Sequence, residues 1–339
     1  MRKKKIIMSF DYELYFGIRS GTVLKSIIEP TNMLMDTMEK YSFRGNFFVD
    51  YLMFRELEKL DEERAQSDLR MLKNQVKDMV RRGHRIELHL HPHWIDAVYN
   101  GDGTWNYSNF THYSLSSLDE ETIVSMFKEG TAYLTNLARE VLPDYRICAF
   151  RAGGWAVQPF DKLKQGFIES GIMIDSSTSY GMFDVREKSS YDFRNMPEKA
   201  YYHFDDDVCK EVENGRFLEV PISSFHNSFI LFCFNSYVYR HTDMFKSLAD
   251  GTHFRKGTHV VKKSLYDKIS DKFNPMNRHM VTFSTLMKCS LNRALRQTRG
   301  EFCVFIDHPK DISKGMINGI NYLGNKCESI NYVDLVVKL

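Results

Sequence analysis

Four of the twelve histidines lie within ten residues, in the segment 84–93. His89 and His91 alternate with apolar residues, which is the period of a strand, so their side chains share one face. Pro92 ends the strand because proline cannot donate a ladder hydrogen bond. His93 follows on the loop, where the chain can turn it back toward His89. Neutral imidazoles grouped in this way are typical of a transition-metal site, although a lone histidine is more often an ordinary polar residue.

Two carboxylates follow the apolar segment 5–10 near the start of the chain. Asp11 and Glu13 are two residues apart, so they project to one side of an extended segment. One of them can complete a two-histidine metal site, and the other can stay free as a general base. The alternative interpretation is that both are solvated loop carboxylates.

An arginine and a fifth histidine follow other apolar segments. Arg151 precedes two glycines that let the backbone come close to a ligand, and it can pair with the base carboxylate and keep it ionised. A structural salt bridge is the alternative. His308 precedes Pro309 and has a reference pKa near neutrality, which suits a general acid.

Short apolar strands alternate with amphipathic helices along the chain, which favours a parallel sheet with helices outside. The predicted strands are residues 5–10, 45–49, 86–90, 147–150, 171–175, 217–223, 228–234 and 301–306. The predicted helices are residues 29–40, 68–82, 118–141 and 160–169. Polar clusters follow several strands, and catalytic groups in barrels of this class lie at the C-terminal strand ends. We therefore expect a closed or nearly closed barrel with one site.

Composition sets the limits on these interpretations. The chain has 339 residues, of which 43% are hydrophobic and 14% aromatic, enough for one large α/β domain or two smaller ones. The six cysteines form no CxxC pair, which favours free thiols in a reducing compartment. No apolar run approaches the roughly 18 residues of a membrane span. We expect a cytoplasmic protein without a transmembrane segment.

Five motifs appear in order: SFDYE at 9–13, GNFFV at 45–49, GHRIELHLHPH at 83–93, FRAGGW at 150–155 and IDHP at 306–309. Together they resemble the polysaccharide deacetylase family, also called the NodB-homology or carbohydrate esterase family 4 domain. The resemblance spans about residues 5–234 and 301–311. It implies an α/β fold, a distorted (β/α) barrel of about seven parallel strands. Residues 1–339 would form a single domain with a basic insertion at about 235–300, before the last strand.

The resemblance also implies an activity and a cofactor. The activity is a metal-dependent carbohydrate N-deacetylase that removes an N-acetyl group from a sugar or polysaccharide precursor, in cell-surface polysaccharide biosynthesis. The cofactor is a divalent metal ion, commonly zinc. The alternatives are a hydrolase of another non-peptide C–N bond on the same scaffold, and a carbohydrate-binding protein with a degenerate site.

Residue roles follow from the matched motifs. His89 and His93 match the metal-binding H-x-x-x-H pair, Asp11 the catalytic base, Arg151 its orienting arginine and His308 the general acid. The family motif has adjacent aspartates, the second of which binds metal. This chain has Tyr12 there, so it resembles the D-x-E branch, with Glu13 as the metal ligand. Gly153 stands where the R-x-P motif usually has proline, a departure that concerns substrate fit.

Further side chains have supporting roles in this prediction. His91 would support the metal site, and Asp175, at a strand end, would tune His308. Tyr12, Trp94 and Trp155 would form an apolar wall for a sugar ring, or else pack at the rim.

The segment 235–300 is strongly basic. It holds thirteen Lys/Arg and four Asp/Glu, a balance of +9, so the rest of the chain carries −7 because the total is +2. A solvated face is one interpretation. The other is recruitment of an anionic substrate, such as a nucleotide-sugar or a lipid-phosphate-linked sugar. No nucleic-acid motif accompanies these residues, so we do not expect nucleic acid as a partner, and docking on a membrane surface stays open.

Overall fold

The computed structural model describes residues 3–109, 111–185, 190–253, 278–298 and 300–336. Its main sheet contains β1 (Lys4–Tyr12), β2 (Gly45–Asp50), β3 (Arg85–Leu90), β6 (Ala149–Ala152), β7 (Ile174–Asp175), β10 (Tyr202–Phe204), β11 (Phe217–Glu219), β14 (Phe302–Asp307) and β15 (Cys327–Ser329). The α-helices are α1 (Glu29–Glu39), α2 (Tyr51–Glu58), α3 (Glu63–Arg81), α4 (Glu120–Arg139), α5 (Asp161–Ser170), α6 (Phe229–His241), α8 (Lys288–Gln297), α9 (Lys314–Leu323) and α10 (Val333–Val336).

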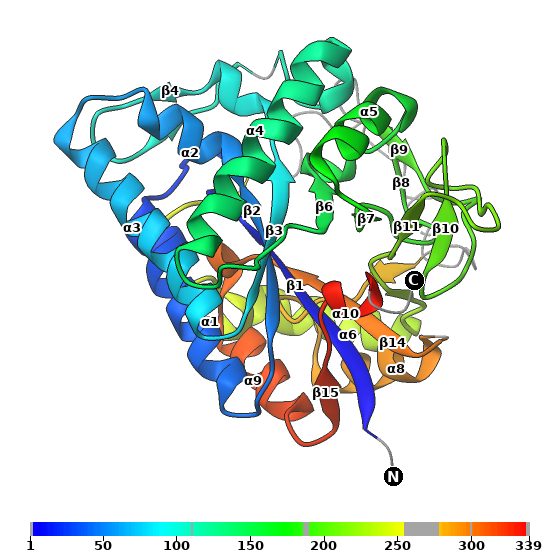
Figure 1. Cartoon of the computed structure of the whole chain (residues 1–339). Coiled ribbons are helices and arrows are strands. Elements are labelled where there is room, and N and C mark those ends of the chain that lie inside the picture. Colours follow the sequence, from blue (N-terminus) through cyan, green and yellow to red (C-terminus); the bar gives the residue numbers. More distant parts are fainter. Residues whose placement is uncertain (1–2, 110, 186–189, 254–277, 299, 337–339) are drawn as a thin grey trace.

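The sheet is mostly parallel and curled (Figure 1). Its order is β10-β11-β7-β6-β3-β2-β1-β14, and the seven described strands from β11 to β14 all run parallel, while β10 is antiparallel and β15 pairs with β1 outside this path. Ser223, just after β11, donates its backbone N–H to the carbonyl of Val304 in β14 at 3.1 Å. The two ends of the curled sheet therefore approach each other, and the predicted distorted barrel of about seven parallel strands is confirmed.

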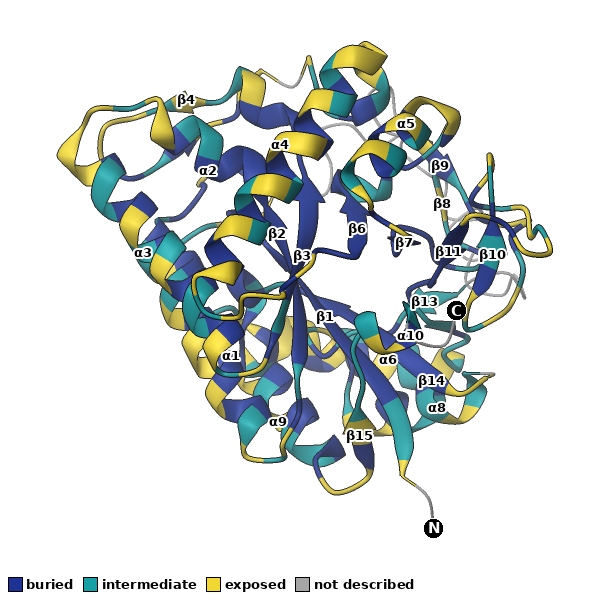
Figure 2. Ribbon diagram, in the orientation of Figure 1, coloured by how far each residue is buried: buried dark blue, intermediate teal, exposed yellow. Residues whose placement is uncertain are grey.

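Helices cover the outside of the sheet, and their buried faces follow the predicted period. In α3 the apolar residues Leu69, Leu72, Val76 and Met79 are buried, and Gly83 follows the helix at a φ of 81°, which glycine adopts without a Cβ clash. Figure 2 shows the same division for α1, α3 and α4, with buried residues toward the strands and exposed residues on the outer surface.

Register brings the predicted site residues to one edge of the sheet. Asp50 of β2 is opposite His89 of β3, and His89 is opposite Arg151 of β6. On the other side, Phe10 of β1 is opposite Asp307 of β14. Since these strands are parallel, their C-terminal ends meet at the same edge, and the loops that follow them converge there.

One predicted strand, at 228–234, is wrong. Residues from Phe229 form α6, and the hydroxyl of Ser228 caps it by accepting from the backbone N–H of Leu231. A continuous apolar run of this length fits a strand and a helix equally well by periodicity. The N-cap serine was the signal that distinguished them.

Only part of the basic segment 235–300 can be placed. It contains the rest of α6, the short strand β13 (His279–Met280) and α8, whereas residues 254–277 and 299 lie outside the described residues.

All six cysteines are free thiols. Among the described residues, no helix is both long enough and apolar enough to cross a membrane.

Candidate active site

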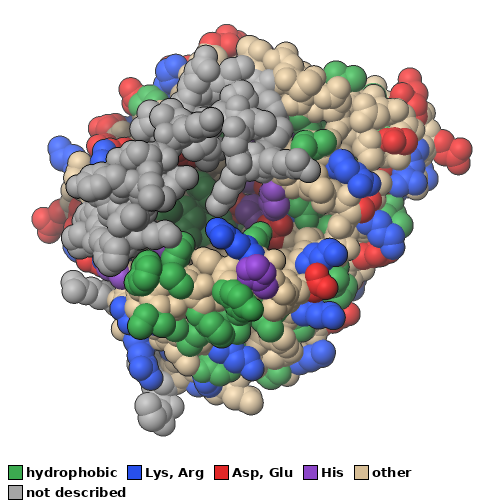
Figure 3. Space-filling view, turned by 180° about the vertical axis from the view of Figure 1, so that it is seen from behind, with side chains coloured by type: hydrophobic (Ala, Val, Ile, Leu, Met, Phe, Trp, Pro, Cys, Tyr) green, Lys and Arg blue, Asp and Glu red, His purple; other side chains and the backbone are tan. Residues whose placement is uncertain are grey.

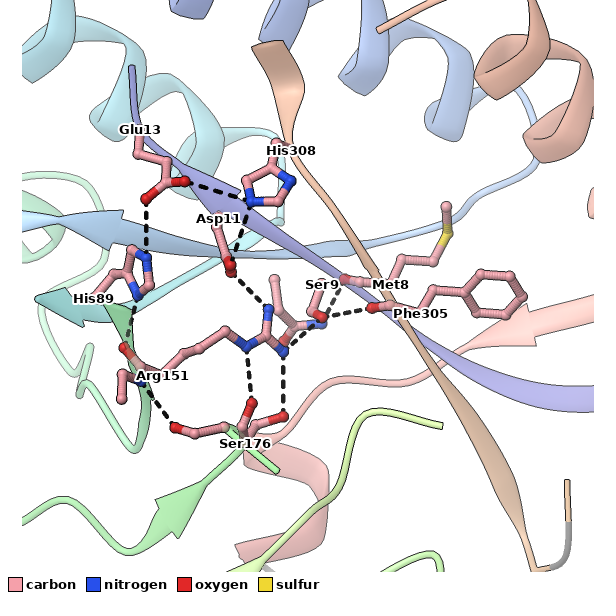
Figure 4. Close-up of polar contacts among 12 residues, drawn as sticks. Met8, Ser9, Asp11, Glu13, His89, Arg151, Ser176, Phe305 and His308 are labelled. Atoms are coloured by element: carbon pink, nitrogen blue, oxygen red, sulfur yellow. Dashed lines mark hydrogen bonds and ion pairs between the residues drawn. The ribbon is translucent and has the colours of Figure 1, made fainter. Parts of the chain in front are cut away.

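The two N-terminal carboxylates lie at the C-terminal end of β1 and point toward the same space (Figure 4). Asp11 is the penultimate residue of β1 and Glu13 follows the strand, and each is only 4% exposed. Both are therefore buried beside other polar groups rather than solvated, and each has its own cationic partner.

Arg151 is the partner of Asp11. Its Nη1 donates to Asp11 Oδ1 at 2.7 Å, its Nε to the carbonyl of Ser176 at 2.8 Å and its Nη2 to Ser9 Oγ at 2.8 Å. The guanidinium also lies over the Phe48 ring, 4.1 Å from its centroid. Burial by itself would raise the pKa of Asp11, but Arg151 holds it below its usual value, so the carboxylate is ionised at neutral pH.

Glu13 is surrounded by imidazoles instead. Its Oε2 lies 3.1 Å from His89 Nε2 and 2.7 Å from His91 Nε2. Ligand atoms of these three buried residues all lie within 4.8 Å of one another, close enough to share one metal ion. Two imidazole nitrogens and one carboxylate oxygen form a donor set that suits zinc and similar divalent metals.

The hydrogen bonding of His89 fits such an ion. Its Nδ1 lies 2.6 Å from the carbonyl oxygen of Arg151, which can only accept, so Nδ1 carries a proton. In the neutral ring, the lone pair of Nε2 then faces the Glu13 carboxylate. Because this nitrogen and the carboxylate oxygen would both be acceptors, a cation between them would stabilise the contact. Burial opposes a charge on His89, but Asp11 and Glu13 raise its pKa to about 9 in the absence of metal. A proton on Nε2 would lie between His89 and Glu13, in the place that a metal ion could take.

The predicted ligand His93 is not part of this group of three. Pro92 starts a 3-10 turn (Pro92–Asp96) that turns the chain away after β3. The His93 ring is fully buried, 4.0 Å from Phe16 and 5.2 Å from Tyr107 between centroids. The H-x-x-x-H spacing favoured His93, whereas the geometry favours His91, which the sequence analysis had placed in a supporting role.

His308 lies over both carboxylates. It follows β14, and its Nε2 is 3.7 Å from Asp11 Oδ2 and 3.4 Å from Glu13 Oε1. Its side chain is 23% exposed, more than the other members of the site. His308 could therefore donate a proton to a bound molecule that enters from solvent above Asp11 and Glu13.

Asp311, which the sequence analysis missed, is the carboxylate beside His308. Its Oδ2 lies 3.4 Å from His308 Nδ1 and its Oδ1 2.6 Å from His253 Nε2. Burial by itself would lower the pKa of His308, but the hydrogen bond with Asp311 raises it above the usual value. The pattern His-x-x-Asp after a strand was the signal available in the sequence.

Asp175 does not tune His308 by contact, so that prediction is corrected. Its carboxylate accepts from the hydroxyl and backbone N–H of Ser177, at 2.7 and 2.9 Å. Glu219, another buried carboxyl, lies beside it, and burial raises the pKa of both groups. A position at a strand end did not show which way the side chain pointed.

Two of the three predicted wall residues are fully buried and cannot contact a sugar. The Tyr12 hydroxyl donates to Gln75 Oε1 at 2.8 Å inside the core. The Trp94 indole donates to Asp50 Oδ2 at 2.5 Å, and that carboxylate also accepts from the backbone N–H of His91 at 3.3 Å. Trp155 is half-buried, so its contact with a substrate stays a prediction.

Asp50 is a further buried carboxylate that the sequence analysis missed. Through its two hydrogen bonds it ties the end of β2 to His91 and to the turn that follows β3. Burial raises the pKa of Asp50 to about 7.

The surface above the site is hollowed. Figure 3 shows histidine and carboxylate side chains at the base of a depression, with hydrophobic and basic side chains on its rim. A cavity of about 430 Å³ includes Asp311 and His253 in its lining, together with Tyr239, Arg240 and Lys246. It therefore adjoins the carboxylate that contacts His308.

Comparisons with known proteins give similar folds at low identity. No family model and no curated protein sequence matches the chain. The structure is similar to a Mycobacterium smegmatis protein assigned as a polysaccharide deacetylase (13% identity, 99% of this chain and 91% of that one, TM-score 0.47). It is also similar to a Bacillus subtilis peptidoglycan deacetylase (11%, 99% and 91%, 0.39).

A third similar structure is a 4-alpha-glucanotransferase from Thermococcus litoralis, at 10% identity and a TM-score of 0.49, with all of this chain matched to 41% of that one. Polysaccharide and peptidoglycan deacetylases are thus among the solved structures that this chain is similar to.

Proposed function

We propose that the protein is a metal-dependent hydrolase that removes the N-acetyl group from an acetylated sugar. One observation carries the proposal. The Glu13–His89–His91 group, which can hold a metal, lies beside a separate ionised carboxylate, Asp11, and both are overlain by His308. Amide hydrolysis needs these three functions close together: activation of the carbonyl, a base for water and an acid for the leaving amine.

The two N-terminal carboxylates have different roles in this proposal. A divalent ion, which we propose to be zinc, would be held by Glu13, His89 and His91, and when bound it would polarise the acetamide carbonyl and the attacking water. Asp11 accepts the proton of that water through Oδ2, because its Oδ1 is already bonded to Arg151. Arg151 keeps Asp11 ionised and fixes its direction.

His308 then supplies the proton that the leaving nitrogen needs. An amine leaves as a neutral molecule only when it gains a proton. Because the pKa of His308 lies above its usual value, a larger share of its rings carries such a proton at neutral pH than in an ordinary histidine. Asp311 stabilises this charged form and orients the ring from the opposite side.

The substrate is proposed to be anionic, as a nucleotide-sugar or a lipid-phosphate-linked sugar would be, and to be processed in the cytoplasm. The basic balance of segment 235–300 supports this proposal. Within the described residues, Arg240 and Lys246 line the cavity that also contains Asp311. An anionic group in that cavity would lie beside the residues that act on the acetamide.

Acetate release tests the proposal directly. Purified protein is stripped of metal, reloaded with zinc and incubated with N-acetylated monosaccharides, oligosaccharides and nucleotide-sugars. We expect one metal ion per chain, acetate and free amine in equal amounts, and loss of turnover in the stripped protein. Turnover on other small amides but on no acetylated sugar would favour the alternative C–N hydrolase. Binding of sugars without any release would favour a degenerate carbohydrate-binding protein.

A further inference from the structure

Lys310 is a buried cation next to the proposed metal group, and none of the roles above uses it. Its side chain is 3% exposed. Its Nζ donates to Glu13 Oε1 and to the carbonyl oxygen of Leu14, both at 2.8 Å. The ammonium also lies 4.7 Å from the centroid of the Phe16 ring and 5.4 Å from that of Tyr15.

The surroundings hold this lysine in one place. The turn Pro309–Asp311 carries it away from β14, and the carbonyl of Lys310 accepts hydrogen bonds from the hydroxyls of Tyr15 and Ser247. A buried ammonium is costly unless it is paired and hydrogen-bonded. The ion pair with Glu13 is therefore a fixed part of the fold and not an optional surface contact.

Lys310 divides the two oxygens of Glu13 between different partners. Oε1 is bonded to Lys310 at 2.8 Å, whereas Oε2 lies 2.7 Å from His91 Nε2 and 3.1 Å from His89 Nε2. Rotation of the carboxylate away from the imidazoles would break the bond to Lys310. A single oxygen is thereby aimed at the two imidazole nitrogens.

We propose that Lys310 is a positioning residue for the metal site, which fixes the direction of Glu13 so that Oε2 faces the ion. This inference rests on the proposed function, because it presupposes a divalent metal at Glu13, His89 and His91. Ligating carboxylates are commonly fixed by hydrogen bonds from outside the ligand set, and loss of such a partner weakens metal binding.

The charge of Lys310 would affect metal affinity in the opposite direction from its positioning of Glu13, and this difference makes the proposal testable. A positive charge repels a divalent cation, so removal of the ammonium would tighten metal binding if charge were its main contribution. Removal would weaken binding if the position of Glu13 were the main contribution. The direction of the change therefore separates a positioning residue from a simple counter-charge.

The test measures zinc affinity of the full-length chain by competition with a chromophoric chelator, without substrate. For Lys310→Met we expect zinc to bind about 10- to 100-fold more weakly. Lys310→Gln keeps a donor without the charge and should recover most of that loss. Lys314→Met is the matched control, because Lys314 is an exposed lysine four residues away, and it should bind zinc as the wild type does.

A double-mutant cycle with Glu13→Gln shows whether Lys310 acts through Glu13. In the Glu13→Gln background, Lys310→Met should cause no further loss of zinc affinity. The double variant removes both buried charges together, so it leaves no unpaired charge and its zinc affinity can be measured even if Lys310→Met alone folds poorly. As a second readout, the visible spectrum of the cobalt(II)-loaded protein should change with Lys310→Met and stay unchanged with Lys314→Met, since it reports the ligands around the ion.

The possible failures are distinct. Unchanged or tighter zinc binding in Lys310→Met overturns the positioning role, and so does an equal loss with and without Glu13. A Lys310→Gln protein as weak as Lys310→Met also contradicts it, because the hydrogen bond would then not be what matters. A wild-type protein that binds no divalent metal refutes the metal dependence of the proposed function itself.

Discussion

Asp11 and Glu13 are both buried carboxylates at the end of β1, yet their neighbours give them different chemistry. Asp11 is bonded to Arg151 on one oxygen and faces His308 with the other. Glu13 is bonded to Lys310 and faces two imidazoles. At the scale of the residue, the partner of each carboxylate decides its role, since both side chains are ionised and equally buried.

Substitution of the two carboxylates should therefore have different effects. Asp11→Asn should keep zinc affinity but lower kcat by about 10²- to 10⁴-fold, the usual contribution of a general base. Glu13→Gln should weaken zinc binding by more than about 100-fold, because loss of a ligand exceeds the loss of an outer partner. Zinc titration and acetate release measure the two effects.

Asp144→Asn, an exposed aspartate, is the control for this pair and should change neither quantity. Equal loss of zinc in Asp11→Asn and Glu13→Gln would mean that Asp11 is itself a ligand and that the base lies elsewhere.

His91 and His93 give a second test at this scale. His91→Ala should abolish tight zinc binding, because it removes one of the three grouped residues that we propose as ligands. His93→Ala should leave much of the zinc affinity and instead lower stability, since His93 fills an aromatic part of the core. Zinc titration together with thermal unfolding distinguishes the two outcomes. Loss of zinc in His93→Ala with retention in His91→Ala would restore the assignment that the H-x-x-x-H spacing predicted.

The pH profile of kcat/KM should follow from Asp11 and His308. The base must be ionised, and because the pKa of Asp11 is below its usual value, the acidic limb should lie below the pKa of an ordinary aspartate. The acid must be protonated, so activity should fall as pH rises through the pKa of His308, which lies above its usual value.

Asp311→Asn should move only the alkaline limb, to lower pH, because burial then lowers the pKa of His308 without the hydrogen bond that most opposes it. Asp175→Asn is the comparison and should leave this limb in place. A shift with Asp175→Asn and none with Asp311→Asn would reverse our assignment.

At the scale of the element, tight turns after the strands set the position of the proposed ligands. The turn Gly153–Trp155 follows β6 and packs against the ring of His91. A Cβ atom at Gly153 would lie 2.5 Å from His91 Nδ1, closer than real side chains approach. This position requires glycine because the backbone at the end of β6 touches His91, a proposed ligand that follows β3.

Gly153→Ala should push the His91 ring and weaken zinc binding by at least about tenfold, with a stability loss of about 1–3 kcal/mol from overpacking. Gly101→Ala is the matched control. It has a φ of 84° with no neighbouring atom within 4 Å, so it should cost about 1–2 kcal/mol through backbone strain without any change in zinc affinity. Unfolding and zinc titration are measured on both proteins, and equal zinc affinity in the two would rule out the role of Gly153.

At the scale of the whole molecule, the curled sheet collects side chains that are nearly 300 residues apart in the sequence. Asp11 and His308 come from the first and one of the last strand ends, and parallel pairing of β1 with β14 brings them together. The charge of the chain is also unevenly distributed, with a balance of +9 in segment 235–300 and −7 elsewhere.

If this charge recruits an anionic substrate, neutralising the pairs Arg255–Lys256 and Lys262–Lys263 should raise KM with little change in kcat, because such charges bind substrate and transition state alike. Both pairs lie outside the described residues. The effect should shrink as salt rises, and a neutral acetylated sugar is the control that should show neither change. An unchanged KM for a nucleotide-sugar at low salt would leave the segment as a solvated face.

The sequence by itself determined the class of fold, the strand ends that carry chemistry and the kinds of residue involved. The reason is local: the period of apolar residues reports which face of an element is buried, and a proline or glycine marks where it ends. His89, Asp11, Arg151 and His308 were found this way because each directly follows or ends an apolar strand.

Only the tertiary structure decided which side chains meet. His91 and His93 are separated by the start of a single turn. Asp175 ends a strand and Asp311 follows one. Spacing along the chain could not tell which residue of each pair faces the site. Lys310 contacts Glu13, and Asp50 contacts Trp94. Both contacts join segments that are far apart in sequence. Such contacts depend on strand order and register, which arise when the whole sheet pairs and curls and not within any one segment.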